Sequence, residues 1–379
     1  MTEILEKTEK KVEYLELIYD LIFVYIIGRN NSLLHHLDDG FISGGMFIAY
    51  VVCSLAVIQI WNFSAYYINI FGKNGLREHI FLFLNMFLLY FIAEGTGENW
   101  ENHYTQYHVA WALILLNTAV QYLIEYHNHK ENQKLAHQIQ KSSIVLITEA
   151  LLILLAVPAY QLFGFECSWI AIVFGMMGAT FTGKRSEEYQ VDFMHLTERA
   201  MLYVVFTFGE MIIGIAGYFE ETFSLNNLYF SLMVFLIAVA LFLSYETLYD
   251  HIVNRELSDN GLNYLLIHVF LIFSLNNITA SLEFMHDSEV NLMQKMLFLI
   301  FSFLLYYCCL FLLGRYAKKQ CGFNRKFYLT MAGMALSFSI FMVLFRNMMQ
   351  INILITVVYS FAIFLILYQF RKHQKNTDL

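Results

Sequence analysis

The chain has 379 residues, of which 58% are hydrophobic and 14% are charged, and its formal net charge is −8. An ordinary soluble domain carries roughly 25% charged residues, so this composition excludes a soluble globular protein. The basic residues are spread along the chain and form no compact patch, which argues against nucleic-acid binding. The composition indicates an integral membrane protein whose main partner is the lipid bilayer.

Repeated apolar runs are long enough to cross a hydrocarbon layer of roughly 30 Å as helices. They predict an all-α, polytopic transmembrane helix bundle of about 12 spans. The sixth run is short and contains two glycines, so a tilted or re-entrant segment is an alternative there. In chain order, the predicted spans are 15–37, 41–71, 78–94, 104–126, 143–163, 166–182, 194–219, 226–250, 260–283, 291–314, 327–346 and 351–370.

The distribution of charge between the spans predicts the orientation. With both termini in the cytoplasm, the inner segments contain most of the basic residues and the outer connections are acidic, as the positive-inside rule requires. The inner basic residues are Lys7, Lys10, Lys11, Lys73, Arg77, Lys130, Lys134, Lys141, Lys184, Arg185, Arg255, Arg315, Lys318, Lys319, Arg325, Lys326, Arg371, Lys372 and Lys375. The outer acidic residues are Asp38, Asp39, Glu94, Glu98, Glu101, Glu166, Glu220, Glu221, Asp287 and Glu289.

The first and seventh spans resemble each other. Each opens with ionisable residues, continues as an aromatic-rich apolar run and ends at a glycine followed by a charge. Six spans in each half would enter the membrane in the same direction, which predicts a 6+6 parallel repeat about an axis along the membrane normal. The expected organisation is a cytoplasmic segment 1–13, two transmembrane halves 14–182 and 194–370, and a cytoplasmic tail 371–379.

The first span carries three ionisable residues, Glu16, Asp20 and Arg29. Glu16 and Asp20 are four residues apart and share a helix face. At 1.5 Å per residue, Asp20 lies roughly 9 Å and Arg29 roughly 22 Å from the cytoplasmic end. Because ionisable side chains inside a span cost on the order of 2.5–3.5 kcal/mol, they are candidate functional residues.

The seventh span carries His195, Glu198, Arg199 and Glu210, with Glu210 roughly 24 Å from the same end. Matching the depths of the two spans predicts an ion pair between Asp20 and Arg199. The same comparison predicts a second pair between Arg29 and Glu210. Alternatively, all these charges serve only to fix helix register and packing. Secondary polar candidates in the following spans are His268, Glu246, Asp250 and Asn276.

Several of these residues carry a family resemblance. The stretch Glu16-Leu-Ile-Tyr-Asp20-Leu-Ile-Phe-Val resembles the "ELxxDLxFV" motif of the bacterial low temperature requirement A (LtrA) family. The segment His195-Leu-Thr-Glu198-Arg199, followed by Phe-Gly209-Glu210, is similar to that family's "HxxER…LGE" segment. The stretch Tyr245–Asp250 is similar to its "WWxYFD" stretch, and His268 falls where the family usually has a histidine.

The sequence departs from that pattern at three positions. Arg29 replaces an uncharged polar residue, Met211 replaces a serine, and Glu246 replaces an aromatic residue. We therefore expect Arg29 to be a lineage-specific counter-charge to Glu210. The resemblance implies a multi-pass protein of the bacterial cell membrane, named for a growth requirement at low temperature, and implies no established reaction.

The features together favour a secondary transporter or proton-linked permease for a small solute or proton. The first alternative is a membrane-embedded enzyme or redox component that acts on a lipid or quinone near His195, Glu198 and His268. The second is a membrane sensor or scaffold. The chain has no nucleophile motif, no phosphate loop and no CxxC pattern among its five cysteines, so we expect no enzyme activity, metal site or cofactor. The sequence leaves a homodimer open.

Overall fold

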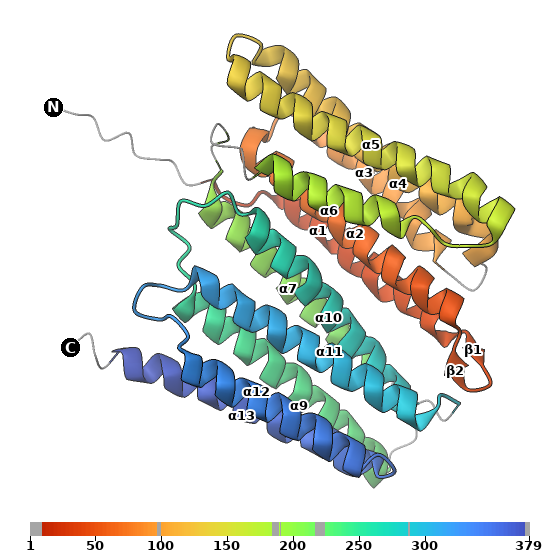
Figure 1. Ribbon diagram of the computed structural model, residues 1–379, viewed down its shortest axis with the longest axis vertical. Helices are drawn as coiled ribbons and strands as arrows, with labels where there is room; N and C mark the ends of the chain where they lie inside the picture. The colour runs from red at the N-terminus through yellow and green to blue at the C-terminus, as the bar shows by residue number, and fades with distance from the viewer. Residues whose placement is uncertain are drawn as a thin grey trace. The chain divides into compact units, whose positions relative to one another are not determined.

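The computed structural model describes residues 10–96, 100–183, 189, 191–216, 224–286 and 289–375 and consists almost entirely of helices (Figure 1). Parts of the predicted segments 1–13 and 371–379 lie outside this range. So do these predicted loop charges: Lys7, Glu98, Lys184, Arg185, Glu220, Glu221 and Asp287.

Twelve α-helices occur in the described part of the chain, one for each predicted span. They are α1 (Tyr14–Asn30), α2 (Gly44–Phe71), α3 (Leu76–Gly95), α4 (Trp100–Asn128), α5 (Gln133–Phe163), α6 (Trp169–Gly183), α7 (Phe193–Gly214), α9 (Leu225–Thr247), α10 (Leu262–His286), α11 (Leu292–Leu312), α12 (Arg325–Leu344) and α13 (Met349–Lys375). The all-α architecture predicted from hydropathy is therefore confirmed.

Nine helices of the described chain are long and apolar enough to cross a membrane. The other three are α1, α6 and α7. Helix α1 has 17 residues and α6 has 15, which at 1.5 Å per residue makes α6 roughly 22 Å long. Helix α7 is longer but carries Glu198, Arg199 and Glu210. Helices α1 and α6 are therefore too short for a simple span, and α7 is too highly charged.

Two boundaries differ from the predicted spans by more than five residues. The first span was expected to continue to residue 37, but α1 ends at Asn30 and a 3₁₀ turn, Asn31–His35, follows. A short hairpin then reverses the chain: β1 (Leu37–Asp38) pairs antiparallel with β2 (Phe41–Ile42). The chain reverses through positive φ angles at Asp39 (50°) and Gly40 (79°). The prediction missed this turn because it followed the apolar residues on either side.

The second difference concerns the predicted cytoplasmic loop 127–142. Helix α5 begins at Gln133, ten residues before the predicted span, because the Asn132 side chain accepts a hydrogen bond from the Leu135 amide and caps the helix. The added first turns are polar but contain good helix formers. Helix start signals thus locate this end better than hydropathy does.

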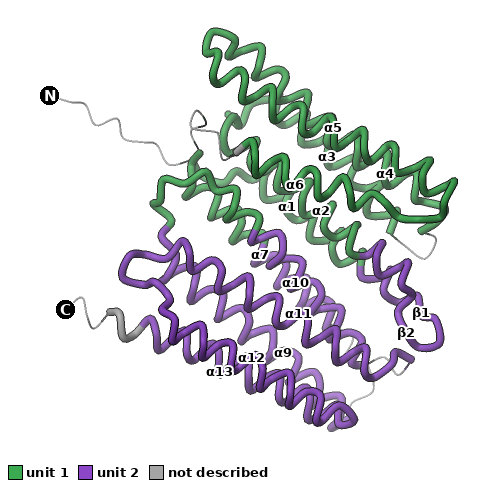
Figure 2. The backbone as a smooth tube through the Cα atoms, in the orientation of Figure 1, with its two compact units in different colours: residues 1–30, 51–203, 255–266 green, residues 31–50, 204–254, 267–379 purple. Residues whose placement is uncertain are grey.

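The chain divides into two compact units (Figure 2). Unit 1 comprises residues 1–30, 51–203 and 255–266, and unit 2 comprises residues 31–50, 204–254 and 267–379. Helices α2, α7 and α10 each contribute residues to both units. The predicted halves 14–182 and 194–370, and the internal repeat, stay predictions.

In unit 1, α4 packs against α3 and α5, α5 packs against α6, and α1 packs against α3. Gly175 of α6 explains the close approach to α5. A Cβ atom at this position would lie 2.0 Å from Oε2 of Glu149, so only glycine fits without movement. The glycine that made the sixth span appear irregular serves to pack two helices together.

In unit 2, α13 packs along α9 and against α12, and α12 also contacts α11. The Tyr306 hydroxyl of α11 donates a hydrogen bond of 2.8 Å to the Leu241 carbonyl of α9. After α9, a π-helical turn (η2, Leu248–Ile252) precedes a backbone bridge between Val253 and Ala317. This bridge ties the end of α9 to the segment that follows α11.

Candidate functional site

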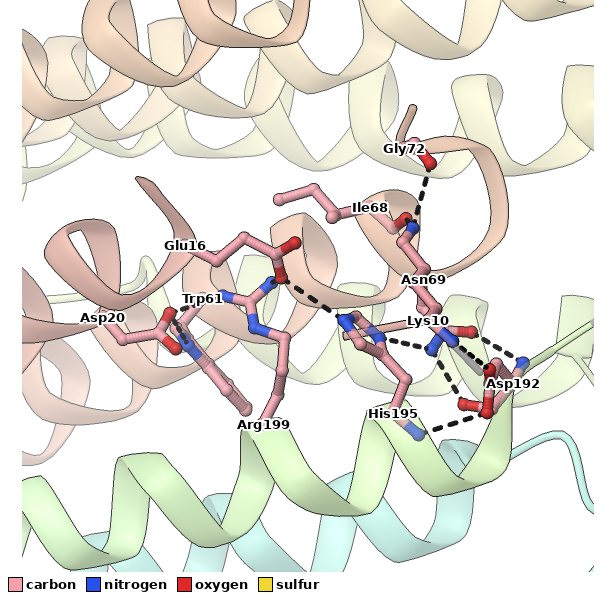
Figure 3. Close-up of polar contacts among 10 residues, drawn as sticks. All are labelled: Lys10, Glu16, Asp20, Trp61, Ile68, Asn69, Gly72, Asp192, His195 and Arg199. Carbon is pink, nitrogen blue, oxygen red and sulfur yellow. Dashed lines mark hydrogen bonds and ion pairs between the residues drawn. The ribbon is translucent and has the colours of Figure 1, made fainter. Parts of the chain in front are cut away.

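Two pairs of ionisable side chains, each spaced by four residues, meet within unit 1. Glu16 and Asp20 lie on one face of α1, and His195 and Arg199 lie on one face of α7. Figure 3 shows the four side chains converging. The spacing predicts the shared face within each helix, and the packing of the helices brings the two faces together.

Arg199 lies at the centre of this cluster. Its side chain is fully buried, and its two terminal nitrogens contact different carboxylates (Figure 3). Nη2 donates a hydrogen bond to Oδ1 of Asp20, and Nη1 lies 3.0 Å from Oε2 of Glu16. The predicted Asp20–Arg199 pair is therefore confirmed, and Glu16 is a second partner of the same arginine.

An aromatic side chain completes the surroundings of Asp20. The Trp61 indole of α2 donates a 2.8 Å hydrogen bond from Nε1 to Oδ1 of Asp20. The same indole lies under the guanidinium group of Arg199, with Cζ 5.8 Å from the ring centroid, which adds a cation–π attraction. Trp61 therefore contacts both members of the ion pair.

His195 links the cluster to the start of α7. Its Nε2 lies 3.6 Å from Oε2 of Glu16, and its Nδ1 lies 3.0 Å from Nδ2 of Asn69. The Asn69 amide is oriented by Asp192: its Oδ1 accepts from the Asp192 amide at 3.1 Å, and its Nδ2 donates to the Asp192 carbonyl at 2.8 Å. Nδ1 of His195 must then accept a hydrogen bond, which assigns the neutral Nε2–H tautomer.

The charges in this cluster do not balance. Glu16 and Asp20 contribute two carboxylates and Arg199 one guanidinium, while His195 is neutral in the assigned tautomer. The formal sum is one negative charge. Oδ2 of Asp20 is buried and has no hydrogen-bond partner among the described residues. A buried site with one excess negative charge favours the uptake of one positive charge, and a proton requires the least space.

A pocket of about 440 Å³ leads towards the cluster from the N-terminal end of α1. Its lining includes Lys10, Glu16, Gly72 and Glu78, so Glu16 belongs to both the pocket and the cluster. The Lys10 ammonium group donates hydrogen bonds to the carbonyls of Ile68 and Gly72, the second at 3.0 Å. Glu16 thus connects an open pocket to the buried ion pair.

Lys10 brings a positive charge to the pocket wall. Burial lowers the pKa of its ammonium group, against the opposing effect of the nearby carboxylates of Glu16 and Asp192. Its backbone amide also lies 3.4 Å from Oδ2 of Asp192, so the segment before α1 contacts the segment before α7.

A chain of neutral polar groups extends from α1 into α3 and α4. The Tyr19 hydroxyl lies 3.0 Å from Oγ of Ser64 and accepts a 3.2 Å hydrogen bond from Asn85. Asn117 donates to Oδ1 of Asn85 at 2.8 Å. These groups neighbour the cluster through Tyr19 and carry no charge.

The remaining predicted residues of the first and seventh spans lie elsewhere. Glu198 is half-buried on α7. Arg29 is exposed, with Nη2 3.9 Å from Oε2 of the exposed Glu94. Glu210 is half-buried in the part of α7 that belongs to unit 2. The predicted Arg29–Glu210 pair would join residues of the two units and stays a prediction.

The secondary candidates all lie in unit 2. Glu246 and Asp250 are exposed at the end of α9. Nε2 of the buried His268 lies 3.1 Å from the Tyr245 hydroxyl. The Asn276 amide donates a 3.0 Å hydrogen bond to the Tyr50 hydroxyl. His268 and Asn276 therefore form polar contacts within the unit 2 core.

Three contributors were missed as members of the site from the sequence: Lys10, Asn69 and Asp192. Lys10 and Asp192 lie before the helices, where charged residues are ordinary, and Asn69 is one of several polar residues near the end of α2. Trp61 gave a weak signal as an aromatic residue near polar neighbours. No pattern in the sequence specified which ionisable group each of them contacts.

Comparison with protein families identifies the chain. A sequence model described as bacterial low temperature requirement A protein (LtrA) matches residues 11–362. The chain belongs to the LtrA family. The match includes α1 and α7 complete, and therefore all four residues of the buried cluster. A search of curated proteins and a search of solved structures each found no match. Membership of the LtrA family, predicted from the motifs around Asp20 and Arg199, is confirmed.

Proposed function

We propose that this membrane protein is a proton-linked secondary transporter of a small solute. The observation that carries the proposal is the fully buried Arg199, which pairs with two carboxylates of α1 at the inner end of a polar pocket. Ionisable residues inside membrane spans are costly to bury and by default indicate a functional site, such as an ion or substrate pathway. The excess negative charge of the cluster provides a place for the coupled proton.

In the proposed cycle, Glu16 takes the proton from the pocket, because it is the member of the cluster that lines the pocket. Its carboxylate becomes a carboxylic acid, and the ion pair with Nη1 of Arg199 is lost. Arg199 then keeps Asp20 as its charged partner. Protonation at the pocket therefore changes the contacts of an arginine that holds α1 and α7 together, which couples a proton to the packing of two helices.

The proposed topology has twelve spans with both termini in the cytoplasm. It is supported by twelve helices in the described chain, nine of them with the length and composition of a span. Helices α1 and α7 would be able to span the membrane because their charged side chains pair with each other and are buried. Basic residues at predicted inner ends, such as Arg77 and Arg325, support the orientation.

The proposal is tested with protein reconstituted in vesicles that enclose a pH-sensitive dye. Panels of amino acids, organic acids, sugars and amines are added outside, and solute-dependent proton flux is recorded between pH 5 and 8. We expect flux with at least one solute class, and at least a tenfold loss of flux in Glu16→Gln and in Asp20→Asn.

Glu125→Gln is the matched control, because Glu125 is a buried carboxylate of the same unit that pairs with Arg77 outside the cluster. This variant should retain proton flux. The proposal fails if the wild-type protein moves no protons with any panel. It also fails if Glu16→Gln and Asp20→Asn keep the wild-type pH profile.

A further inference from the structure

An apolar groove lies in unit 2 between α11, α12 and α13. Its volume is about 440 Å³, within the roughly 300–1,000 Å³ of small-molecule sites. The lining is aromatic and aliphatic, with Phe303, Tyr307, Phe311, Met331, Ala335 and Phe338 among its residues. The Tyr359 hydroxyl at its wall donates a 2.8 Å hydrogen bond to Oγ of Ser337, so this polar group already has a partner within the protein. The groove therefore suits a hydrocarbon occupant.

The groove has the length of one membrane leaflet. On α12 its lining runs from Tyr328 to Phe338, ten residues or about 15 Å along the helix axis. Half of a hydrocarbon core of roughly 30 Å is the same length. An acyl chain extends over one leaflet, so its length matches this apolar lining.

Positive charge gathers at one end of the groove. The segment between α11 and α12, with the first turn of α12, contains five exposed basic residues and no acidic residue. These residues, here named the basic rim, are Arg315, Lys318, Lys319, Arg325 and Lys326. Tyr328 and Leu312 of the groove lie within one helical turn of Arg325 and Arg315. Among the described residues, no ion pair neutralises the rim.

We propose that this groove and its basic rim form a binding site for an anionic phospholipid of the membrane. One acyl chain occupies the groove, and the basic rim holds the headgroup phosphate at the interface. Clusters of Lys and Arg beside a membrane-spanning helix attract anionic lipids through the surface charge, and the groove adds a contact that ordinary annular lipids lack. This site is separate in residues from the Arg199 cluster and does not depend on transport.

The test uses the full-length protein in vesicles that contain either phosphatidylglycerol or phosphatidylcholine with a photoreactive acyl chain. Crosslinked peptides are quantified by mass spectrometry. We expect phosphatidylglycerol to label the groove residues of α11 and α12 at least fivefold more than phosphatidylcholine does. Millimolar inorganic phosphate should not reduce the labelling, which distinguishes a lipid headgroup from a free phosphate ion.

Two variants with matched controls separate the groove from its rim. The double variant Arg325→Gln, Lys326→Gln should abolish the preference for phosphatidylglycerol. The other three rim residues are kept so that the orientation of the protein in the membrane does not change. Lys130→Gln, Lys134→Gln removes two cations from another predicted cytoplasmic connection and should keep the preference. Ala335→Trp fills the groove and should remove labelling, while Leu336→Trp on the exposed face of α12 should not.

Equal labelling by the two lipids would overturn the proposal. Crosslinks spread evenly over all exposed helices would also overturn it, because they would identify annular lipid only. An equal effect of Ala335→Trp and Leu336→Trp would show that the groove itself holds nothing.

Discussion

Two buried carboxyl groups of unit 1 have opposite surroundings. Asp20 and Glu149 are both fully buried. Asp20 contacts Arg199 and the Trp61 indole, whereas neither oxygen of Glu149 has a hydrogen-bond partner among the described residues. An isolated charge is too costly to bury, so Asp20 is expected to be ionised and Glu149 neutral. Burial identifies both residues as unusual, and only the contacts distinguish their charge states.

The contrast extends to the neighbours of Glu149. A Cβ atom on Gly175 would lie 2.0 Å from Oε2 of Glu149 and 2.4 Å from Nε2 of Gln59. These two side-chain atoms are therefore at most 4.4 Å apart. Nevertheless Nε2 of Gln59 donates to the Ile172 carbonyl at 3.2 Å. The carboxyl group of Glu149 therefore packs against a glycine and near a neutral amide, whereas Asp20 contacts a cation.

The largest effect is expected for removal of the cation. Arg199→Gln leaves Glu16 and Asp20 buried without a counter-charge and should lower the free energy of unfolding by about 3–5 kcal/mol. Thermal unfolding of the purified protein in detergent measures the loss. The double variant Asp20→Asn, Arg199→Gln should be more stable than Arg199→Gln alone. If Arg199→Gln unfolds at the same temperature as the wild type, the ion pair does not contribute to the stability of the fold.

A smaller effect is expected where Glu149 meets Gly175. Gly175→Ala places a methyl group 2.0 Å from Oε2 of Glu149 and should cost about 1–3 kcal/mol through overpacking. The second variant Gly175→Ala, Glu149→Ala should restore part of the loss in the same unfolding measurement. Gly209→Ala is the control: apart from the backbone of its own helix and its chain neighbours, no atom lies within 4 Å of its Cβ position, so it should be neutral or slightly stabilising.

The smallest effect is expected for conservative replacement of the unpaired carboxyl group. Glu149→Gln keeps the shape of a neutral acid and should change the free energy of unfolding by less than about 1 kcal/mol, whereas Asp20→Asn removes a charge from an ion pair and should cost about 2 kcal/mol. Equal losses in the two variants would contradict the different charge states assigned to the two groups.

Reactivity towards a hydrophobic carbodiimide sharpens the same comparison. The reagent attacks carboxylic acids in their protonated form, so Glu149 should be labelled at neutral pH and Asp20 should not. Labelling, measured by mass spectrometry, should disappear in Glu149→Gln and persist in Glu125→Gln, because Glu125 pairs with Arg77 outside this site. Labelling of Asp20 instead of Glu149 would reverse the assignment of their charge states.

The sequence alone predicted the helices and one central contact. Apolar runs located twelve helices, and equal depth in two spans predicted the Asp20–Arg199 pair, because helix rise converts residue number into depth. Glu16 was recognised as a candidate, but its contacts with Arg199 and His195 depend on the rotation of α1 and α7 about their axes. Residue spacing within one helix does not determine that rotation.

Other features had no local signal. The Asn69 side chain binds the backbone of Asp192, which is 123 residues away in the sequence. Backbone groups are the same at every position, so the sequence gives no sign of this contact. The basic rim was recognised only as a topology signal, because the groove beside it exists only when three helices pack. The extension of α5 was missed because hydropathy measures the membrane core, whereas helix formation continues beyond it.

The Asn69 amide has a consequence for the timing of proton transfer. Its two ends are held by the backbone of Asp192, so its NH₂ group faces Nδ1 of His195. An imidazolium would oppose this donor with a second donor, and the amide would have to rotate by half a turn and release both backbone contacts. The orientation of the His195 ring is thereby tied to the contacts between Asn69 and Asp192, so any rotation of that amide would also loosen the start of α7.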